Sequence, residues 1–155
     1  VHMGGREEEF KCAAYLQKCC EEIGLEAKIE PFEVVSADID EVKLTLAITN
    51  LIENGIKYNS IEGEGWVHVS LNADHQYFYL KVEDNGCGIP EEDLDQIFER
   101  FYRVDKSHSR EIGGTGLGLA ITRSSILMHR GAIKAHSELG EGTTFDVRIP
   151  LTYIA

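Results

Sequence analysis

The sequence contains no long hydrophobic run, and this absence excludes one whole class of protein. No apolar stretch in its 155 residues approaches the roughly 18 residues that a membrane-spanning helix needs. No signal-peptide pattern opens the chain either. Val1, His2 and Met3 instead have the character of a cloning remnant, which we assign to residues 1–4. We therefore expect residues 5–155 to be one part of a longer protein, and we expect this part to make no direct membrane contact.

Basic charge is also scarce, and this limits the partners that the surface can attract. The chain carries 15 lysines and arginines against 27 aspartates and glutamates, a net charge of −12. A general nucleic-acid surface needs a basic face, so we expect no nucleic-acid partner. Any bound polyphosphate must instead meet cations that are gathered locally, together with a metal ion.

Cysteine pairs with metal-binding spacing are missing as well. The 4 cysteines, Cys12, Cys19, Cys20 and Cys87, form no CxxC motif, which argues against a zinc site and favours a reduced, cytoplasmic setting. What is present is ordinary for a soluble globular domain, with 43% hydrophobic and 27% charged residues. The length suits one well-packed domain.

Periodicity predicts the elements of that domain. Helical spacing indicates helices near 7–22, 39–59, 91–96 and 116–130, and alternation indicates strands within 25–36 and near 66–71, 77–83, 132–136 and 143–149. In the helix at 39–59, an apolar face follows the spacing of Leu44, Ala47, Ile48, Leu51 and Gly55. A second stripe beside it contains Asn50, Asn54, Lys57 and Tyr58. An amide oxygen suits magnesium and a lysine suits phosphate, although asparagines on a solvated edge give the same pattern.

Asp84 ends the strand at 77–83 on the same face as Leu80 and Val82, so a carboxylate points toward the apolar side. Such a group needs a dedicated hydrogen-bond donor. The exocyclic amine of adenine is one candidate. The amides of the turn that follows Asp84 are another, and locally this second arrangement is the commoner one.

A glycine-rich run, GGTGLGL at 113–119, leads into the helix near 116–130. Closely spaced glycines before a helix start bring free amides to an anion, typically phosphate, but flexible loops share this composition. Four cations precede the run, namely Arg100, Arg103, Lys106 and Arg110. Their place between aromatic residues and a glycine hinge suggests a mobile lid.

Taken in order, these segments resemble the motifs of the catalytic ATP-binding domain of bacterial sensor histidine kinases, in the superfamily that also contains gyrase-type and mismatch-repair ATPases. NLIENGIKY at 50–58 resembles the N box, DNGCGI at 84–89 the first glycine box, and FERFYR at 98–103 the F box. GTGLGL at 114–119 resembles the second glycine box and GEGTTF at 140–145 the closing motif. The resemblance implies an α+β fold of the Bergerat type. In that fold, a mixed, largely antiparallel sheet of about five strands packs on about three helices, with an ATP lid.

The resemblance also implies a site for ATP and Mg²⁺. Asn54 would hold the metal, Lys57 would contact phosphate oxygens, and Arg103 would reach the terminal phosphate. Asp84 would bind the adenine amine beside Tyr58. The remaining nucleotide contacts would come from Asn50, Gly86, Gly88, Ile89, Gly114, Gly116, Leu117, Gly118 and Thr143.

Two departures refine this expectation. The topoisomerase-type relatives place a water-activating glutamate where this sequence has Asn50, so we expect slow hydrolysis and transfer of phosphate to another acceptor. None of the 6 histidines begins the phosphoacceptor pattern. The acceptor histidine is therefore expected on a dimerisation domain outside this chain, with a response regulator receiver domain downstream and a parent that is cytoplasmic or membrane-anchored.

Three alternatives stay open at this point. A nucleotide-dependent interaction module would bind ATP without transferring phosphate. A serine kinase of the anti-sigma type shares the fold but lacks the segment at 98–103 and the long lid. An ATPase of the topoisomerase type would need a base in place of Asn50.

Overall fold

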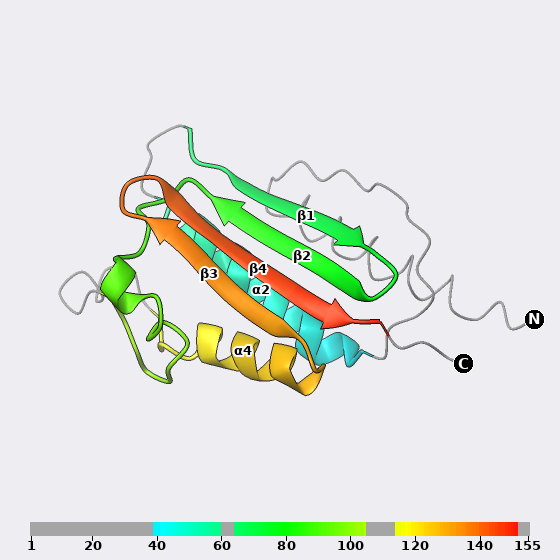
Figure 1. Cartoon of the computed structure of the whole chain (residues 1–155). Helices are drawn as coiled ribbons and strands as arrows, with labels where there is room; N and C mark the ends of the chain where they lie inside the picture. Colours follow the sequence, from blue (N-terminus) through cyan, green and yellow to red (C-terminus); the bar gives the residue numbers. More distant parts are fainter. Residues whose placement is uncertain (1–38, 60–63, 105–113, 152–155) are drawn as a thin grey trace, which may run out of the picture.

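The computed structural model describes residues 39–59, 64–104 and 114–151, which form a two-layer domain (Figure 1). The elements are α2 (Glu41–Lys57), β1 (Val67–Ala73), β2 (Tyr77–Asp84), the 3-10 helix η1 (Glu91–Asp93), α4 (Gly118–Met128), β3 (Ala132–Glu138) and β4 (Gly142–Pro150). The helix predicted near 7–22 and the strands predicted within 25–36 lie outside the described residues. So do the remnant assigned to residues 1–4 and the lid residues 105–113.

The four described strands form one sheet in the order β1-β2-β4-β3, and every pair in it is antiparallel. The α+β class is therefore confirmed. Within the described residues the sheet has four antiparallel strands covered by two α-helices, so the predicted fifth strand, third helix and mixed character have no counterpart there. The predicted short helix at 91–96 is a 3-10 turn of three residues.

Helix α2 begins at a side-chain cap and buries the face that the sequence predicts. Asp40 accepts a hydrogen bond at Oδ1 from the backbone N–H of Lys43, at 3.1 Å, which satisfies one of the free amides of the first turn. The buried residues of the helix are Leu44, Ala47, Ile48, Leu51, Ile52 and Gly55. The helix is shorter than the predicted range 39–59, because Asp40 is the cap and Tyr58 already ends it.

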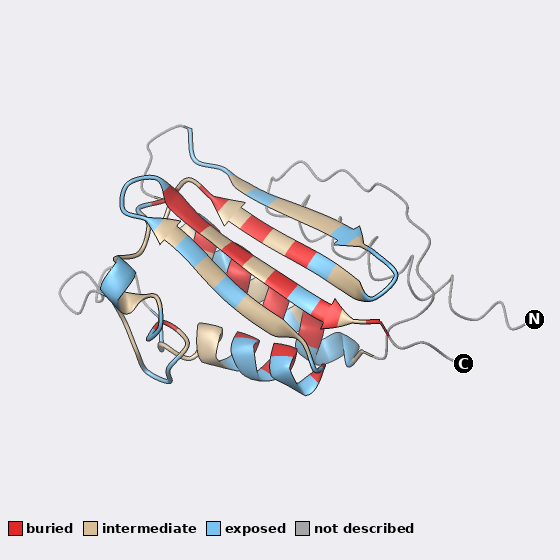
Figure 2. Ribbon diagram, in the orientation of Figure 1, coloured by how far each residue is buried: buried red, intermediate tan, exposed pale blue. Residues whose placement is uncertain are grey.

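The hydrophobic core lies between α2, α4 and one face of the sheet (Figure 2). Leu80 and Val82 of β2, and Phe145, Val147 and Ile149 of β4, point into it and are at most 3% exposed. Alternation along β2 therefore correctly predicts its inner face. Ile126 of α4 completes the core from the helical layer.

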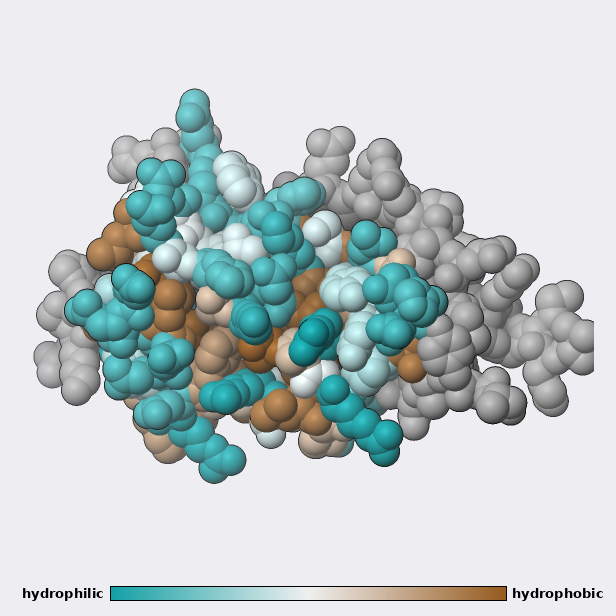
Figure 3. Space-filling view, in the orientation of Figure 1, coloured by the Kyte–Doolittle hydropathy of each residue, from teal (hydrophilic) through white to brown (hydrophobic). Residues whose placement is uncertain are grey.

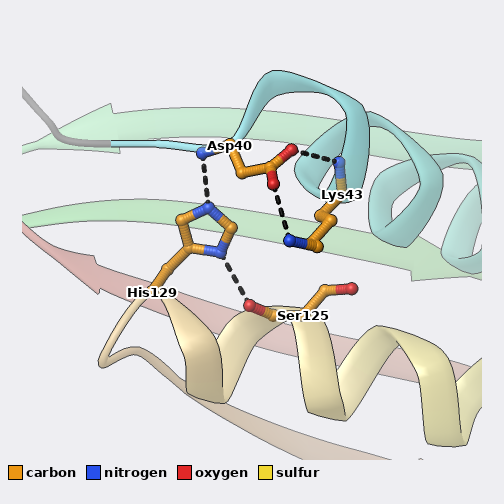
Figure 4. A network of polar contacts seen from close by, with 4 residues as sticks. All are labelled: Asp40, Lys43, Ser125 and His129. Atoms are coloured by element: carbon orange, nitrogen blue, oxygen red, sulfur yellow. Dashed lines mark hydrogen bonds and ion pairs between the residues drawn. The ribbon is translucent and has the colours of Figure 1, made fainter.

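The two helices lie side by side beneath the sheet and are joined at the middle and at the end of α4. In its middle, the buried hydroxyl of Thr122 donates to the carbonyl oxygen of Ala47 in α2, at 3.3 Å. At its end, His129 bridges the helices (Figure 4). Its Nδ1 lies 2.6 Å from the carbonyl oxygen of Ser125, while its Nε2 accepts from the backbone N–H of Asp40 at 2.8 Å. A carbonyl only accepts, so the ring proton resides on Nδ1 and the imidazole is neutral.

The opposite face of the sheet is polar. One row across the four strands contains Ser70, Lys81, Asp146 and Lys134 in register, and hydrophilic side chains gather over the strands in Figure 3. His136 lies on this face with its side chain 66% exposed. Of the helices in the described part of the chain, none combines the length and apolarity needed to cross a membrane.

Candidate functional site

Asp84 lies at the end of β2, buried and facing the helical layer, as its position in the sequence predicts. It is 9% exposed. Its Oδ1 accepts a hydrogen bond from the N–H of Gly86 at 2.9 Å, so the alternative of a turn-capping aspartate is right for one of the two oxygens. Burial raises the pKa of this carboxyl, and the nearby amides of Gly86 and Thr143 oppose the rise. The site therefore holds a desolvated acceptor that a further donor would stabilise.

The two glycines after Asp84 let the loop pack closely against its own chain. A Cβ on Gly86 would lie 2.6 Å from the carbonyl oxygen of Tyr58, and one on Gly88 would lie 2.1 Å from that of Glu138. Gly88 also has a φ of +72°, which glycine adopts without strain. Cys87 donates its N–H to the carbonyl of Tyr58 at 3.0 Å. The loop is thus clamped between the end of α2 and the end of β3.

Ser137 contacts two of the predicted site residues, Ile89 and Thr143, and was not itself predicted from the sequence. Its Oγ accepts a hydrogen bond from the N–H of Ile89 at 2.8 Å and lies 2.9 Å from the hydroxyl of Thr143. In the sheet, Ser137 pairs with Thr143, and Thr143 pairs with Asp84. A serine in a strand carries no motif of its own, so only the strand register could have revealed it.

The cationic groups meet at the glycine-rich segment. Arg103 donates from Nη1 to the carbonyl oxygen of Gly114 at 3.0 Å, and a Cβ on Gly114 would lie 2.6 Å from the Nζ of Lys57. Gly114 and Gly116 have φ values of +131° and +69°. Residues from three distant motifs are therefore assembled at one place, where Arg103 bonds to backbone that only glycine forms easily and the ammonium group of Lys57 lies beside it.

Gly116 also joins the F box to this segment. Phe101 donates its N–H to the carbonyl of Gly116 at 2.8 Å, and a Cβ on Gly116 would lie 2.9 Å from the backbone of Phe101. The predicted lid cations Lys106 and Arg110 lie outside the described residues. Arg100, the fourth predicted cation, is exposed.

Asn50 and Asn54 have different surroundings although they share one stripe of α2. Asn50 donates from Nδ2 to the carbonyl oxygen of Gly118 at 3.2 Å and so fastens α2 to the first turn of α4. Asn54 is half-buried one turn further along.

Tyr58 lies at the end of the same stripe and is 40% exposed. The Nζ of Lys57 lies 5.4 Å from the centroid of its ring. Leu117, the residue before α4, is half-buried.

Two hollows, of about 430 and about 420 Å³, lie along the sheet. The first is on the polar face of the sheet, and the second, at the end of the sheet, is bordered by Asp84 and Thr143 but not by Asn54 or Gly116. Within the described residues, no three or more histidines, cysteines, aspartates or glutamates form a metal-binding cluster. Among the predicted site residues, Asp84 and Thr143 thus border one hollow, while Lys57 and Arg103 lie together at Gly114.

Comparisons with known proteins agree on one family. The profile described as "Histidine kinase-, DNA gyrase B-, and HSP90-like ATPase" matches residues 39–153. A sensor protein kinase WalK from Staphylococcus haemolyticus is 42% identical over 124 residues, which are 80% of this chain and 20% of that protein. The chain therefore spans about a fifth of the length of this curated relative.

Solved structures match nearly the whole chain. A mycobacterial sensor histidine kinase, MprB, has a TM-score of 0.73 at 27% identity, covering 94% of this chain and 97% of that one. Full-length ShkA in complex with AMPPNP has a TM-score of 0.64 at 26% identity, covering 94% of this chain and 30% of that one.

Proposed function

This chain belongs to the histidine kinase-, DNA gyrase B- and HSP90-like ATPase family, as a catalytic ATP-binding domain of the sensor histidine kinase type, and from that membership we propose how it handles ATP. It binds Mg-ATP and presents the γ-phosphoryl group to a histidine that lies on a dimerisation domain outside this chain. The single observation that carries the proposal is the meeting of Lys57, Arg103 and Gly114 at one end of the helical layer, with Asp84 at the end of the neighbouring strand.

The base would be read by Asp84. A desolvated carboxylate accepts a hydrogen bond from the adenine amine, and the clamped backbone of Gly86, Gly88 and Ile89 would border the base and sugar. The ring of Tyr58, which is partly exposed beside Lys57, would form the wall of the base pocket. This end of the site supplies selection rather than chemistry.

The phosphates would lie along the start of α4. Free amides of Leu117 and Gly118 at a helix start favour an anion, and Lys57 and Arg103 add two positive charges in an acidic protein. Arg103 donates to the carbonyl oxygen of Gly114, and the Nζ of Lys57 lies beside the same residue. An incoming triphosphate would draw Arg103 from that carbonyl oxygen to phosphate oxygens, with Lys57 already close by.

The residues fit a magnesium ion that is held mainly by the nucleotide. Mg²⁺ takes oxygen ligands and keeps several waters, so the amide oxygen of Asn54 with phosphate oxygens is a suitable set, and no carboxylate cluster is needed. When bound, the metal neutralises charge on the phosphates. The chain's own part is to fix the γ-phosphate through Asn54, Lys57 and Arg103, because positioning and charge stabilisation dominate phosphoryl transfer.

Asn50 supports transfer over hydrolysis. Its side-chain amide donates to Gly118, and an amide has no basic group with which to activate water. The γ-phosphoryl group would therefore be transferred to a histidine imidazole rather than to water, and from that histidine to the receiver domain of a response regulator. We propose that the domain works on the cytoplasmic side of a parent that is anchored in a membrane.

Titration calorimetry with ATP, ADP and AMPPNP in Mg²⁺ tests the binding step. We expect saturable heat with each nucleotide, and no phosphate on the isolated chain after incubation with labelled ATP. Adding the cognate dimerisation domain should then give acid-labile phosphohistidine on that domain. Binding without transfer under these conditions would instead identify an interaction module, and absence of binding would remove the proposal altogether.

A further inference from the structure

Three side chains with hydrogen-bonding groups stand in one row across the helix-facing side of the sheet. Ser137 of β3 pairs with Thr143 of β4, and Thr143 pairs with Asp84 of β2. Thr143 and Asp84 are 7% and 9% exposed. The row therefore ends at the carboxylate that the proposed function assigns to the base.

The protons in this row can be counted from its partners. A serine hydroxyl has one proton and two acceptor lone pairs. The carbonyl oxygen of Gly142 lies 2.6 Å from the Oγ of Ser137 and can only accept, so it takes the proton of Ser137. The N–H of Ile89, at 2.8 Å, can only donate and occupies one lone pair of the same oxygen.

The remaining contact then has one direction. The two hydroxyl oxygens of Ser137 and Thr143 lie 2.9 Å apart, and by distance either could donate. Because the only proton of Ser137 is already used, Thr143 must donate to Ser137. Its proton points toward β3, and the oxygen offers only lone pairs in other directions. Ionised Asp84 is likewise an acceptor only.

We propose that Ser137 is a positioning residue that sets nucleotide specificity: it holds the Thr143 hydroxyl as an acceptor, so that Thr143 and Asp84 together select a purine with an amino group at position 6 over one with a carbonyl. A carbonyl at this edge would meet lone pairs on both side chains, whereas an amine has two protons to donate. The inference rests on the proposed ATP site and deepens it.

The test compares ATP with inosine triphosphate, which has a carbonyl at position 6. Dissociation constants are measured in Mg²⁺ at one mildly alkaline pH, chosen to favour the ionised form of Asp84, for the wild-type chain and for Ser137→Ala, Ser137→Thr and Thr143→Val. In Ser137→Ala the Thr143 hydroxyl can turn and donate to the carbonyl. We expect the preference for ATP to fall by about threefold to tenfold, the range for one neutral hydrogen bond.

The other variants separate specificity from a structural role. Ser137→Thr keeps a hydroxyl and should keep the wild-type preference. Thr143→Val should lower the preference, and the double variant Ser137→Ala/Thr143→Val should lower it no further, because Ser137 acts through Thr143. Equal weakening of both nucleotides in Ser137→Ala, with an unchanged ratio, would overturn the inference.

A second variant tests the same inference if Ser137→Ala does not fold. If Ser137→Ala is unfolded by circular dichroism, an unchanged ratio in Thr143→Val is enough to overturn it. If the wild-type chain binds neither nucleotide, the proposed function fails. A wild-type chain that prefers ATP, with variants that keep that preference, leaves the proposed function standing and removes only the role of Ser137.

Discussion

The side chains at the two ends of the proposed site are held in place by different kinds of structure. At the base end, Asp84, Thr143 and Ser137 lie in adjacent strands, so the hydrogen-bond register of the sheet fixes their spacing. At the phosphate end, Lys57 and Arg103 are long side chains that meet glycine backbone next to residues 105–113. In the proposed mode of binding, the base end is therefore set before a nucleotide arrives, whereas Arg103 at the phosphate end exchanges a carbonyl oxygen for phosphate.

This difference assigns the two ends separate tasks. A row of buried groups in a sheet keeps its geometry at low cost and can discriminate between bases. Side chains that bond to exposed carbonyl oxygens can leave them for phosphate, because water or phosphate replaces what is lost. We therefore expect backbone substitutions in the base-end loop to affect stability strongly, and side-chain substitutions at the base end to affect nucleotide affinity more than those at the phosphate end.

The largest effect is expected where the base-end loop is packed most tightly. A Cβ in Gly88→Ala would lie 2.1 Å from the carbonyl oxygen of Glu138, at a φ of +72°. We expect the free energy of unfolding to fall by about 3 kcal/mol, from strain plus collision with backbone. Gly140→Ala is the matched control, since its φ is +82° but nothing lies within 4 Å, and it should cost only about 1 kcal/mol. Urea denaturation measures both, and equal losses would contradict this picture of the loop.

Asp84→Asn should separate binding from stability. The amide keeps an oxygen for the N–H of Gly86 but presents a donor to the adenine amine, so we expect the dissociation constant for ATP to rise by about 100-fold. Burial raises the pKa of the native carboxyl, which shows that its charge is unfavourable there, so thermal unfolding should occur at the same temperature or higher. A large fall in both affinity and stability would indicate that Asp84 is mainly structural.

The pH dependence of ATP binding follows from the same carboxyl. Its pKa is raised in the free domain by burial, so the ionised form that accepts from adenine is lost as pH falls through that raised value. Binding of the amine stabilises the charge and lowers the pKa, and the complex therefore releases protons near this pH. The folding stability of the free domain changes in the opposite direction: it increases as pH falls through the raised pKa, because protonation removes the cost of burying the charge. Calorimetry in buffers of different ionisation enthalpy should detect the released proton, and it should vanish in Asp84→Asn.

His129 tests how firmly the helix of the phosphate end is held from its far end. In His129→Ala, α4 loses the bond from Asp40 and the ring between the helices, so we expect a loss of about 2 kcal/mol in the free energy of unfolding. His136→Ala is the control, because that ring is 66% exposed and its removal should change the free energy by less than about 0.5 kcal/mol. Comparable losses in the two variants would show that the His129 bridge between α2 and α4 contributes little to the free energy of unfolding.

The smallest effect is expected at the phosphate end. Arg103→Ala removes a cation proposed to reach the terminal phosphate, so ATP affinity should fall by about fivefold, in line with a partly exposed ion pair, while ADP affinity stays the same. Arg100→Ala, which removes an exposed neighbour, should change neither. Fluorescence titration with ATP and ADP measures the difference. A hundredfold loss for both nucleotides would mean that this end is as rigid as the base end.

Local patterns in the chain were enough to predict much of this protein. The buried face of α2, the inward position of Asp84 and the existence of the strands β1 and β2 follow from periodicity, because residues on one face of a helix or strand recur at fixed spacing. The order of the five sequence motifs along the chain was enough to identify the family.

Other features were decided only when distant elements came together. Ser137 donates to the carbonyl oxygen of Gly142 and therefore accepts the proton of Thr143 from the neighbouring strand. The side-chain amide of Asn50 donates to the carbonyl oxygen of Gly118, 68 residues away in the sequence. The reason is that periodicity records which side of an element a residue faces but not which element lies opposite. That choice is made by the sheet register and by the packing of α2 on α4, and with it the hydrogen-bonding character of the site.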